Sequence, residues 1–334
     1  MPHRKHFPLI LRLCLRSFRD MNYKIILSKQ LRQLATALCL IWLGCFTCVT
    51  AQDDDEVERV TSNLIVVNVT VTDRSGKYVR GLKQEDFRIF EDGKEQSPDT
   101  FSAFGAESTP FAAAILLDTS GSMETRMSLG RAAAIRFLDG LRDEDVAAVY
   151  HFDRKIELMQ EFSYSRDLAP LVFELKAQGM TALNDAIVRA ATDLTARTER
   201  RRAIIVLSDG ADNNSSASTD KALETALAAN CVIYTVDMND PQGGGSQAFL
   251  QQNAGALKKM AEKTGGRYIA TPGGKELREA FLQIAEELRN QYTIGYRPLN
   301  KTRDGRWRNL EVKLATRPEL TPRARKGYRL PKEK

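Results

Sequence analysis

An apolar run that ends in a carboxylate constrains this chain more than any other feature of its sequence. Residues 111–117 carry no polar side chain, and Asp118 follows them directly. Short runs of this kind are typical of strands in parallel sheets, which helices cover on both faces. Three of the four residues after Asp118 are Ser or Gly. The stretch therefore predicts a fully buried strand that opens into a loop rich in hydroxyl groups.

Residues 109–289 alternate between strand-like and helix-like apolar patterns. Further strand-like runs follow at 146–152, 156–162, 203–207, 231–236 and 268–270. Segments with apolar residues three and four positions apart, as in helices, separate most of these runs. The runs 146–152 and 156–162 are instead close enough in the sequence to form a hairpin. We therefore predict an α/β fold with a doubly wound, mainly parallel sheet and one antiparallel edge strand. Residues 239–253, which include three consecutive glycines, are expected to form a loop.

The regions on either side of this α/β part have the period-two pattern of β-strands. Apolar residues alternate along 65–71, and a second candidate strand, 87–91, precedes an Asp-Gly pair that favours a hairpin. Alternation returns at 292–296 and 310–314. Two or three strands are marginally stable alone. We therefore predict that the two flanks pair into one small β-sandwich-like domain, into which the α/β domain is inserted.

The first 51 residues read as a secretory leader. Sixteen uncharged, mostly apolar residues, 34–49, are preceded by basic residues and followed by small and then acidic ones. The run is short for a membrane-spanning helix, so we expect cleavage after Ala51, with an uncleaved anchor as the alternative. Because the basic segment before it is too long for a signal peptide, we expect translation to start at Met21. A weak lipoprotein signal at 43–45 makes lipidation a further alternative.

The predicted organisation is a leader over 1–51, an N-terminal β segment over 52–108, the α/β domain over 109–289, and a C-terminal β segment over 290–334. Residues 57–105 of the N-terminal segment are expected to pair with the C-terminal one. The mature chain would be exported to the periplasm, the cell envelope or the medium. Membrane association would then require an uncleaved leader or lipidation.

Charge argues against nucleic acid as a partner. The net charge of +6 comes from 49 basic and 43 acidic residues, but the first 51 residues hold eight of the basic and one of the acidic ones. The remainder therefore has 41 basic and 42 acidic residues, whereas a nucleic-acid-binding domain keeps a basic surplus. Only Cys231 of the five cysteines lies outside the leader, so no intrachain disulfide framework is expected.

Five oxygen-bearing side chains occur where the α/β pattern places strand ends and loops. Asp118 ends the first buried strand, and Asp209 follows the end of another. Ser120 and Ser122 come directly after Asp118, and Thr181 lies in a loop that enters a helix. In a doubly wound sheet, ligands bind beyond the carboxyl ends of the strands. If the two strands are neighbours, all five side chains meet at one edge of the sheet.

Such a set suits a hard cation, because it offers carboxylates and hydroxyls and neither imidazole nor thiolate. We expect Mg²⁺, with Mn²⁺ or Ca²⁺ as competitors. Two carboxylates balance the charge of a dication, so the ion stays electrophilic enough to accept an acidic oxygen from a partner. Each residue also has a plain structural explanation, since Asp, Ser and Thr commonly cap helices and form turns. That explanation weakens when all five occur in the order that a single site needs.

The spacing D-x-S-x-S at 118–122, followed by Thr181 and Asp209, resembles the metal-ion-dependent adhesion site of von Willebrand factor type A domains. Residues 109–289 are similar to that family as a whole. The resemblance implies direct coordination of the metal by Ser120 and Ser122, with Thr181 joining in a ligand-bound arrangement. It implies largely water-mediated roles for Asp118 and Asp209.

The flanks resemble a secreted bacterial family, the von Willebrand type A-related Acidobacteria domain. The similar segments are 71–77, 81–82, 86–87 and 90–94 on the N-terminal side, and 292–297 and 327–328 on the C-terminal side. The resemblance therefore extends over nearly all of the mature chain. It implies a fold and a site more firmly than it implies a partner.

The leading interpretation is an exported, non-enzymatic binding or adhesion protein whose divalent metal captures an acidic group of a protein partner. One alternative is a structural scaffold of an envelope complex, in which the metal only braces the fold. A weaker alternative is a hydrolase with Ser120 as nucleophile. It has little support, because the mature chain has a single histidine, His151, and no G-x-S-x-G motif.

Overall fold

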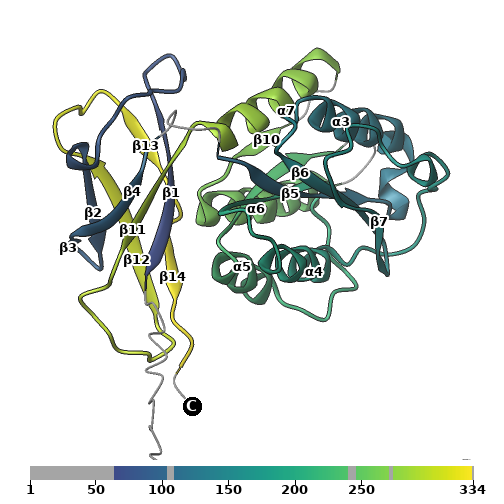
Figure 1. The fold of residues 1–334 in the computed structure, drawn as a ribbon. Helices are drawn as coiled ribbons and strands as arrows, with labels where there is room; N and C mark the ends of the chain where they lie inside the picture. Colours follow the sequence, from purple (N-terminus) through teal and green to yellow (C-terminus); the bar gives the residue numbers. More distant parts are fainter. Residues whose placement is uncertain (1–63, 104–108, 240–245, 271–273, 333–334) are drawn as a thin grey trace, which may run out of the picture. The chain divides into compact units, whose positions relative to one another are not determined.

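The computed structural model describes residues 64–103, 109–239, 246–270 and 274–332. All of them belong to one compact unit, Ser62–Lys334, which contains a six-stranded sheet and two four-stranded sheets (Figure 1). The predicted leader, its cleavage site and the start at Met21 lie outside the described residues. Within the described part of the chain, no helix is both long enough and apolar enough to cross a membrane.

The six-stranded sheet has the order β10-β9-β8-β5-β6-β7. Its strands are β5 (Phe111–Asp118), β6 (Val146–Phe152), β7 (Ile156–Ser163), β8 (Arg201–Ser208), β9 (Cys231–Asp237) and β10 (Tyr268–Ala270). All neighbouring pairs are parallel except β6 and β7, which are antiparallel. The predicted mainly parallel sheet with one antiparallel edge strand is thus confirmed.

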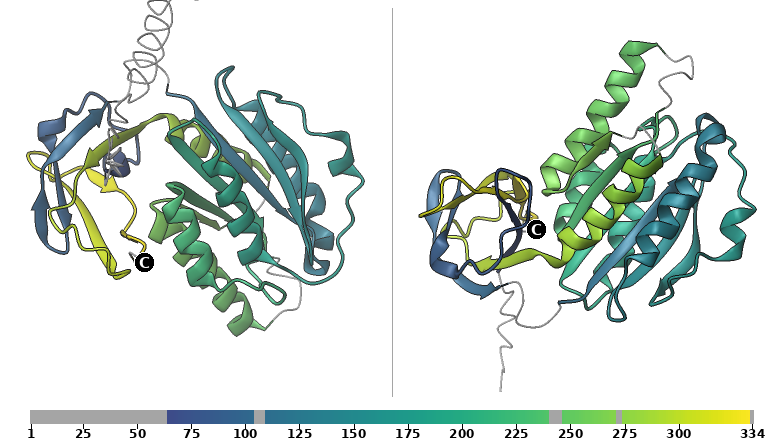
Figure 2. Two further views of the ribbon diagram at one scale, coloured as in Figure 1. Left: turned by 60° about the horizontal axis from the view of Figure 1, so that its bottom comes forward. Right: turned by 90° about the horizontal axis from the view of Figure 1, so that it is seen from above.

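Helices cover both faces of this sheet, as Figure 2 shows. They are α3 (Met127–Asp139), α4 (Leu183–Thr195), α5 (Thr219–Ala228), α6 (Gln247–Thr264) and α7 (Gly274–Arg289). One apolar cluster joins Ile115 of β5 to α3 and α7. A second cluster joins Leu116 of β5 to α4, α5 and α6. Strand β5 is therefore buried on both faces along its whole length, which explains its uninterrupted apolar sequence.

The loop expected over residues 239–253 is wrong in its second half, because α6 already begins at Gln247. Ser246 caps this helix, and its Oγ accepts a hydrogen bond from the backbone N–H of Phe249 at 3.3 Å. A serine at this position is a common helix cap and is consistent with a helix start at residue 247, directly after the glycine-rich segment. Residues 240–245 lie outside the described part of the chain.

The flanks form two antiparallel sheets with the orders β13-β1-β11-β4 and β14-β12-β2-β3. Their strands are β1 (Ile65–Thr72), β2 (Phe87–Glu91), β3 (Lys94–Gln96), β4 (Pro98–Ser102), β11 (Gln291–Tyr296), β12 (Trp307–Leu314), β13 (Thr321–Arg323) and β14 (Gly327–Arg329). Strand β1 pairs with β11, and β2 pairs with β12, so each sheet combines both flanks. One apolar cluster includes side chains from both sheets, and the ring centroids of Phe87 and Tyr292 lie 5.1 Å apart across it.

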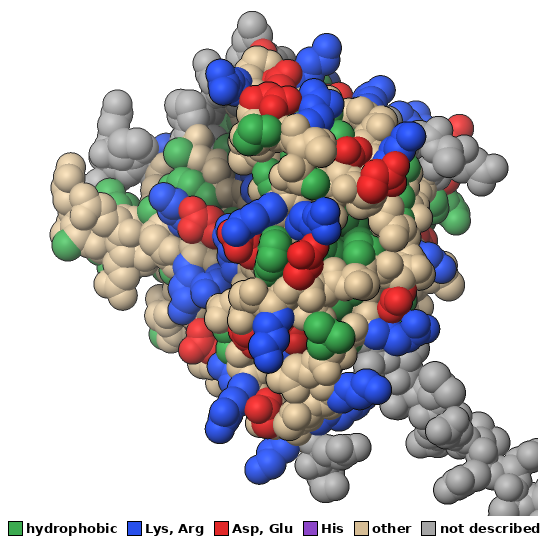
Figure 3. Space-filling model, turned by 90° about the vertical axis from the view of Figure 1, so that its left-hand side faces the viewer, with side chains coloured by type: hydrophobic (Ala, Val, Ile, Leu, Met, Phe, Trp, Pro, Cys, Tyr) green, Lys and Arg blue, Asp and Glu red, His purple; other side chains and the backbone are tan. Residues whose placement is uncertain are grey.

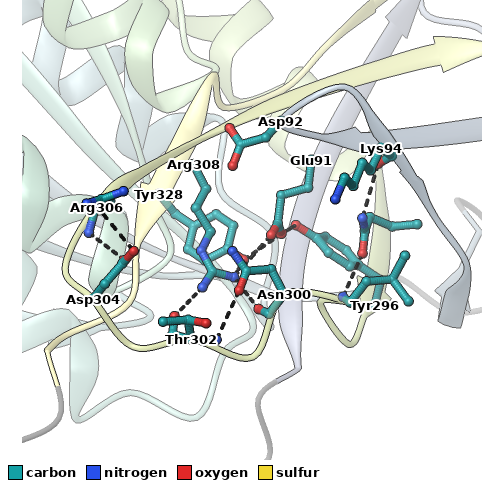
Figure 4. Close-up of polar contacts among 12 residues, drawn as sticks. Glu91, Asp92, Lys94, Tyr296, Asn300, Thr302, Asp304, Arg306, Arg308 and Tyr328 are labelled. Atoms are coloured by element: carbon teal, nitrogen blue, oxygen red, sulfur yellow. Dashed lines mark hydrogen bonds and ion pairs between the residues drawn. The ribbon is translucent and has the colours of Figure 1, made fainter.

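A buried carboxylate sits among the polar side chains of this β-sandwich (Figure 4). Glu91 Oε2 accepts hydrogen bonds from the hydroxyls of Tyr296 and Tyr328, both at 2.7 Å. Glu91 Oε1 lies 3.1 Å from the guanidinium of Arg308, which also donates to the backbone carbonyl of Asn300 at 2.6 Å. Glu91 and Arg308 are only 3% and 2% exposed. Glu91 thus contacts one side chain from each of three C-terminal strands, β11, β12 and β14.

We predict that Arg308→Ala lowers the free energy of unfolding by about 3–5 kcal/mol, because it leaves the Glu91 carboxylate buried without its cation. The measurement is urea denaturation followed by circular dichroism. Arg306→Ala is the matched control: Arg306 pairs with Asp304, but its side chain is 85% exposed, so a change within about 0.5 kcal/mol is expected. Equal losses in the two variants would contradict a stabilising role for the buried pair.

Candidate functional site

The two aspartates at strand ends lie at one edge of the six-stranded sheet. Asp118 is the last residue of β5, and Asp209 follows β8. These strands are parallel neighbours, with Leu117 opposite Leu207 in the register. The hydroxyl of Ser208, the residue directly before Asp209, donates to Asp118 Oδ2 at 2.6 Å, so the ends of the two strands meet. The condition that the sequence left open, adjacency of the two strands, is met.

Asp118 is buried, and both of its carboxyl oxygens accept hydrogen bonds. Its Oδ1 accepts from the backbone N–H of Ser120 at 2.9 Å, and its Oδ2 accepts from the hydroxyl of Ser208 at 2.6 Å. The residue is only 2% exposed. Loss of hydration on burial raises the pKa of its carboxyl to about 7, although the hydrogen bonds oppose this shift. A cation close to this carboxyl would favour its ionised form.

The two serines after Asp118 present their hydroxyls to each other. Ser120 precedes the 3₁₀ helix η2 (Gly121–Arg126), and its Oγ lies 3.3 Å from Ser122 Oγ. Ser120 is buried, whereas Ser122 is exposed. The pair therefore leads from the buried carboxyl of Asp118 toward the solvent.

Thr181 is brought to this loop by backbone hydrogen bonds. The N–H of Gly121 donates to the carbonyl of Gly179 at 3.2 Å, and the N–H of Gln178 donates to that of Thr119 at 2.8 Å. These bonds hold the loop before α4 against the loop after β5. Thr181 is buried, and it follows Gly179 by two residues. The structure thus brings the neighbourhoods of Asp118 and Thr181 together.

A third loop, which follows Asp209, hydrogen-bonds to the backbone of Thr181. Asn213 Oδ1 accepts from the backbone N–H of Thr181 at 2.8 Å. The backbone N–H groups of Asn213 and Asn214 donate to the carbonyl of Thr181 at 3.1 and 2.9 Å. Asp209 Oδ1 accepts from the N–H of Ala211 at 3.0 Å. All five side chains singled out in the sequence therefore belong to three loops that hydrogen-bond to one another.

Two residues that hydrogen-bond to the candidate site, Ser208 and Asn213, were not predicted from the sequence. Ser208, whose hydroxyl donates to Asp118, directly precedes Asp209 at the end of its strand, so its position was a usable signal. Asn213 had no such signal, because its partner Thr181 lies 32 residues away in the sequence. Only the fold shows that the two meet.

The chemistry of the donors fits a hard divalent cation. Two carboxyl groups and three hydroxyl groups lie in the three loops, and no cluster of three or more His, Cys, Asp or Glu suited to a metal occurs among the described residues. The set thus differs from carboxylate cages and from thiolate or imidazole sites. The burial of the Asp118 carboxyl, which is only 2% exposed, is a second sign of fit, because a dication would offset the lost hydration.

The arrangement does not favour Ser120 as a hydrolytic nucleophile. His151 Nδ1 lies 3.1 Å from the hydroxyl of Thr119, and its Nε2 lies 3.4 Å from Glu157. Ser120 Oγ has Ser122 Oγ as its hydrogen-bond partner. Thr119 itself is buried and donates to the carbonyl of Phe152 at 3.2 Å. Neither hydroxyl therefore combines exposure with a histidine base, as nucleophilic catalysis requires.

Residues 113–211 match the family model of the von Willebrand factor type A domain, and no curated protein matches the chain. Similar solved structures include an aerotolerance-related membrane protein from Bacteroides fragilis, with 18% identity over 53% of this chain and 98% of that one, at a TM-score of 0.43. A von Willebrand factor type A protein from Catenulispora acidiphila has 15% identity over 80% of this chain and 64% of its own, at 0.45. The corresponding domain of the type V pili tip protein Mfa5 from Porphyromonas gingivalis has 15% identity over 54% and 95%, at 0.44.

We predict that Asp118→Asn changes how stability depends on pH when a chelator is present. Because the pKa of Asp118 is raised to about 7 in the folded state, above about 3.9 when unfolded, the folded protein binds the extra proton between these values. The wild-type free energy of unfolding should therefore fall as pH rises through that window, by up to about 4 kcal/mol. Asn imitates the protonated carboxyl and should abolish this contribution, which thermal melts from pH 4 to 8 would measure. Parallel profiles for the variant and the wild type would contradict the burial argument; Asp220→Asn, at an exposed position, is the control.

Proposed function

We propose that this protein is an exported, non-enzymatic binding protein, because residues 113–211 match the family model of the von Willebrand factor type A domain. Its divalent metal captures an acidic group of a protein partner. The observation that carries the proposal is the set of three interlocked loops at the carboxyl edge of the sheet. They place Asp118, Ser120, Ser122, Thr181 and Asp209 in adjoining segments.

In this proposal Ser120 and Ser122 hold the metal directly, and Asp118 and Asp209 act mainly through water. Thr181 joins when the partner is bound. Mg²⁺ is the first choice, with Mn²⁺ or Ca²⁺ as competitors. When bound, the ion would supply the positive charge that attracts an acidic oxygen. Because Ser122 is the exposed member of the set, the partner would approach from its side.

The rim of the site would decide which acidic partner fits. Met180, directly before Thr181, is 37% exposed, and residues 212–214 are exposed as well. Asp212 in turn anchors the start of α4, because its Oδ2 accepts from the backbone N–H of Asn184 at 2.8 Å. An exposed apolar side chain beside a charged contact adds affinity and selectivity to it. Export rests on the predicted leader.

We predict that Asp118→Ala and Asp209→Ala each weaken Mn²⁺ binding at least tenfold, because each removes one of the two charges that balance the dication. Isothermal titration of the metal-free protein with MnCl₂ measures this, with one site expected in the wild type. Asp220→Ala is the matched control, since Asp220 lies in the first turn of α5 and pairs with the exposed Lys259. Unchanged Mn²⁺ binding in both site variants would overturn the proposed metal site.

A partner test separates capture from a structural role of the metal. Immobilised protein is exposed to cell-envelope extract in Mg²⁺ or in chelator, and the retained proteins are compared. Under the proposal, a partner is retained in Mg²⁺ and lost with the chelator or in Asp118→Ala. If the chelator lowers the melting temperature but leaves retention unchanged, the metal only braces the fold.

A further inference from the structure

The C-terminal stretch 321–329 is divided between the two sheets of the β-sandwich. Its first part, β13, pairs with β1 at residues 70–72. Its last part, β14, pairs with β12, but only at residues 307–309. The chain passes from one sheet to the other between these two short strands. Each sheet therefore receives only part of an edge strand.

This division leaves one side of β12 without a strand partner over residues 310–314. On its other side, β12 pairs with β2 along this whole stretch. The direction of each backbone group follows from the alternation along the strand. The N–H of Ala315 donates to Asp86 on the β2 side, whereas the N–H of Leu310 donates to Lys326 on the opposite side. The N–H and C=O of Val312 must then point away from β2, into the space between β12 and the stretch 317–326, whose strand β13 pairs with β1 and not with β12.

A groove of about 440 Å³ runs along this open edge. Its apolar lining includes Leu310 and Leu320, which are buried, and Val312 and Leu314, which are half-buried. Four of its lining residues are basic and one, Glu311, is acidic. The exposed cations among them are Lys313, which lies 3.0 Å from Glu311, Arg317, which lies 3.1 Å from Glu319, and Lys326. On the face of the molecule that Figure 3 shows, basic, acidic and apolar side chains are interspersed over the surface.

We propose that this groove binds an extended, acidic segment of a partner protein, which adds to the sheet as a strand beside β12. Exposed sheet edges pair readily with another chain, because their N–H and C=O groups lack partners. In an added strand, alternate side chains would face the apolar lining. The side chains between them would face outward beside Lys313, where opposite charges on neighbouring strands attract each other. The segment that fits has about five residues, or roughly 16 Å, with apolar and acidic residues in alternation.

The groove is a surface separate from the proposed metal site. The groove is lined only by residues 310–326, all of them from the C-terminal flank. Its recognition would rest on backbone hydrogen bonds and cross-strand charge pairs, and neither requires a metal. Binding at the groove should therefore persist in chelator, which separates it from capture at Asp118.

The test uses the exported chain in chelator and a fluorescent heptapeptide of alternating Val and Glu, with fluorescence anisotropy as the measurement. We expect saturable binding that weakens at least tenfold when alternate peptide nitrogens are methylated, since methylation removes the N–H groups that pair with the edge. A heptapeptide of alternating Val and Lys should bind at least tenfold more weakly. Absence of binding, or equal binding of the methylated or lysine peptide, would overturn the proposal.

Substitutions in the groove test whether the peptide binds there. Val312→Pro removes an N–H that points into the groove and not toward β2, and Lys313→Glu reverses the charge beside the added strand. Each should weaken the Val–Glu peptide at least tenfold, whereas Lys94→Glu, on the opposite edge strand β3 of the same sheet, should not. Lys313→Glu keeps the test valid if the proline variant does not fold. Wild-type affinity in Lys313→Glu, or in a folded Val312→Pro, would exclude this groove.

Discussion

A strand that is buried on both faces rarely carries a charged side chain before it ends. This constraint decides where chemistry is found in the α/β part of the chain. Strand β5 is buried along its whole length, so Asp118 is the first position at which a charged side chain can occur. Because β8 is the parallel neighbour of β5, its own polar end, with Ser208 and Asp209, falls at the same edge. The apolar core and the cluster of oxygen donors are therefore two results of one packing arrangement.

A strand could be predicted from the sequence where its packing in the fold leaves a local pattern of apolar residues. The run before Asp118 predicted β5, and the alternation along 65–71 predicted β1, because burial on two faces or one dictates those patterns. Strands β4, β13 and β14 left no such trace, since they are short and mostly polar, whereas β3 was signalled only by the Asp-Gly pair before it. The contact between Thr181 and Asn213 could not be predicted either, because the two residues are far apart in the sequence and meet only in the folded chain. An exposed asparagine in a loop carries no sign of such a partner.

The β-sandwich depends on a different kind of interaction, namely buried polar contacts. Its two sheets are built from segments about two hundred residues apart, and buried polar contacts fix how they meet. Glu91 from the N-terminal flank receives Tyr296, Arg308 and Tyr328 from the C-terminal one. A buried pair of this kind contributes little net stability compared with apolar side chains, but it penalises any arrangement that leaves one charge alone. We infer that the cluster favours the correct pairing of the flanks.

The two proposed sites attract an acidic partner for different physical reasons. At Asp118 the attraction would come from a dication, whose field acts on a single carboxylate and does not depend on the conformation of the partner's backbone. Along β12 the unpaired N–H and C=O of Val312 require an extended backbone first, and Lys313 only selects among extended segments. Acidity alone therefore does not tell which surface a partner uses. Sensitivity to chelator identifies the first surface, and sensitivity to the partner's backbone N–H groups identifies the second.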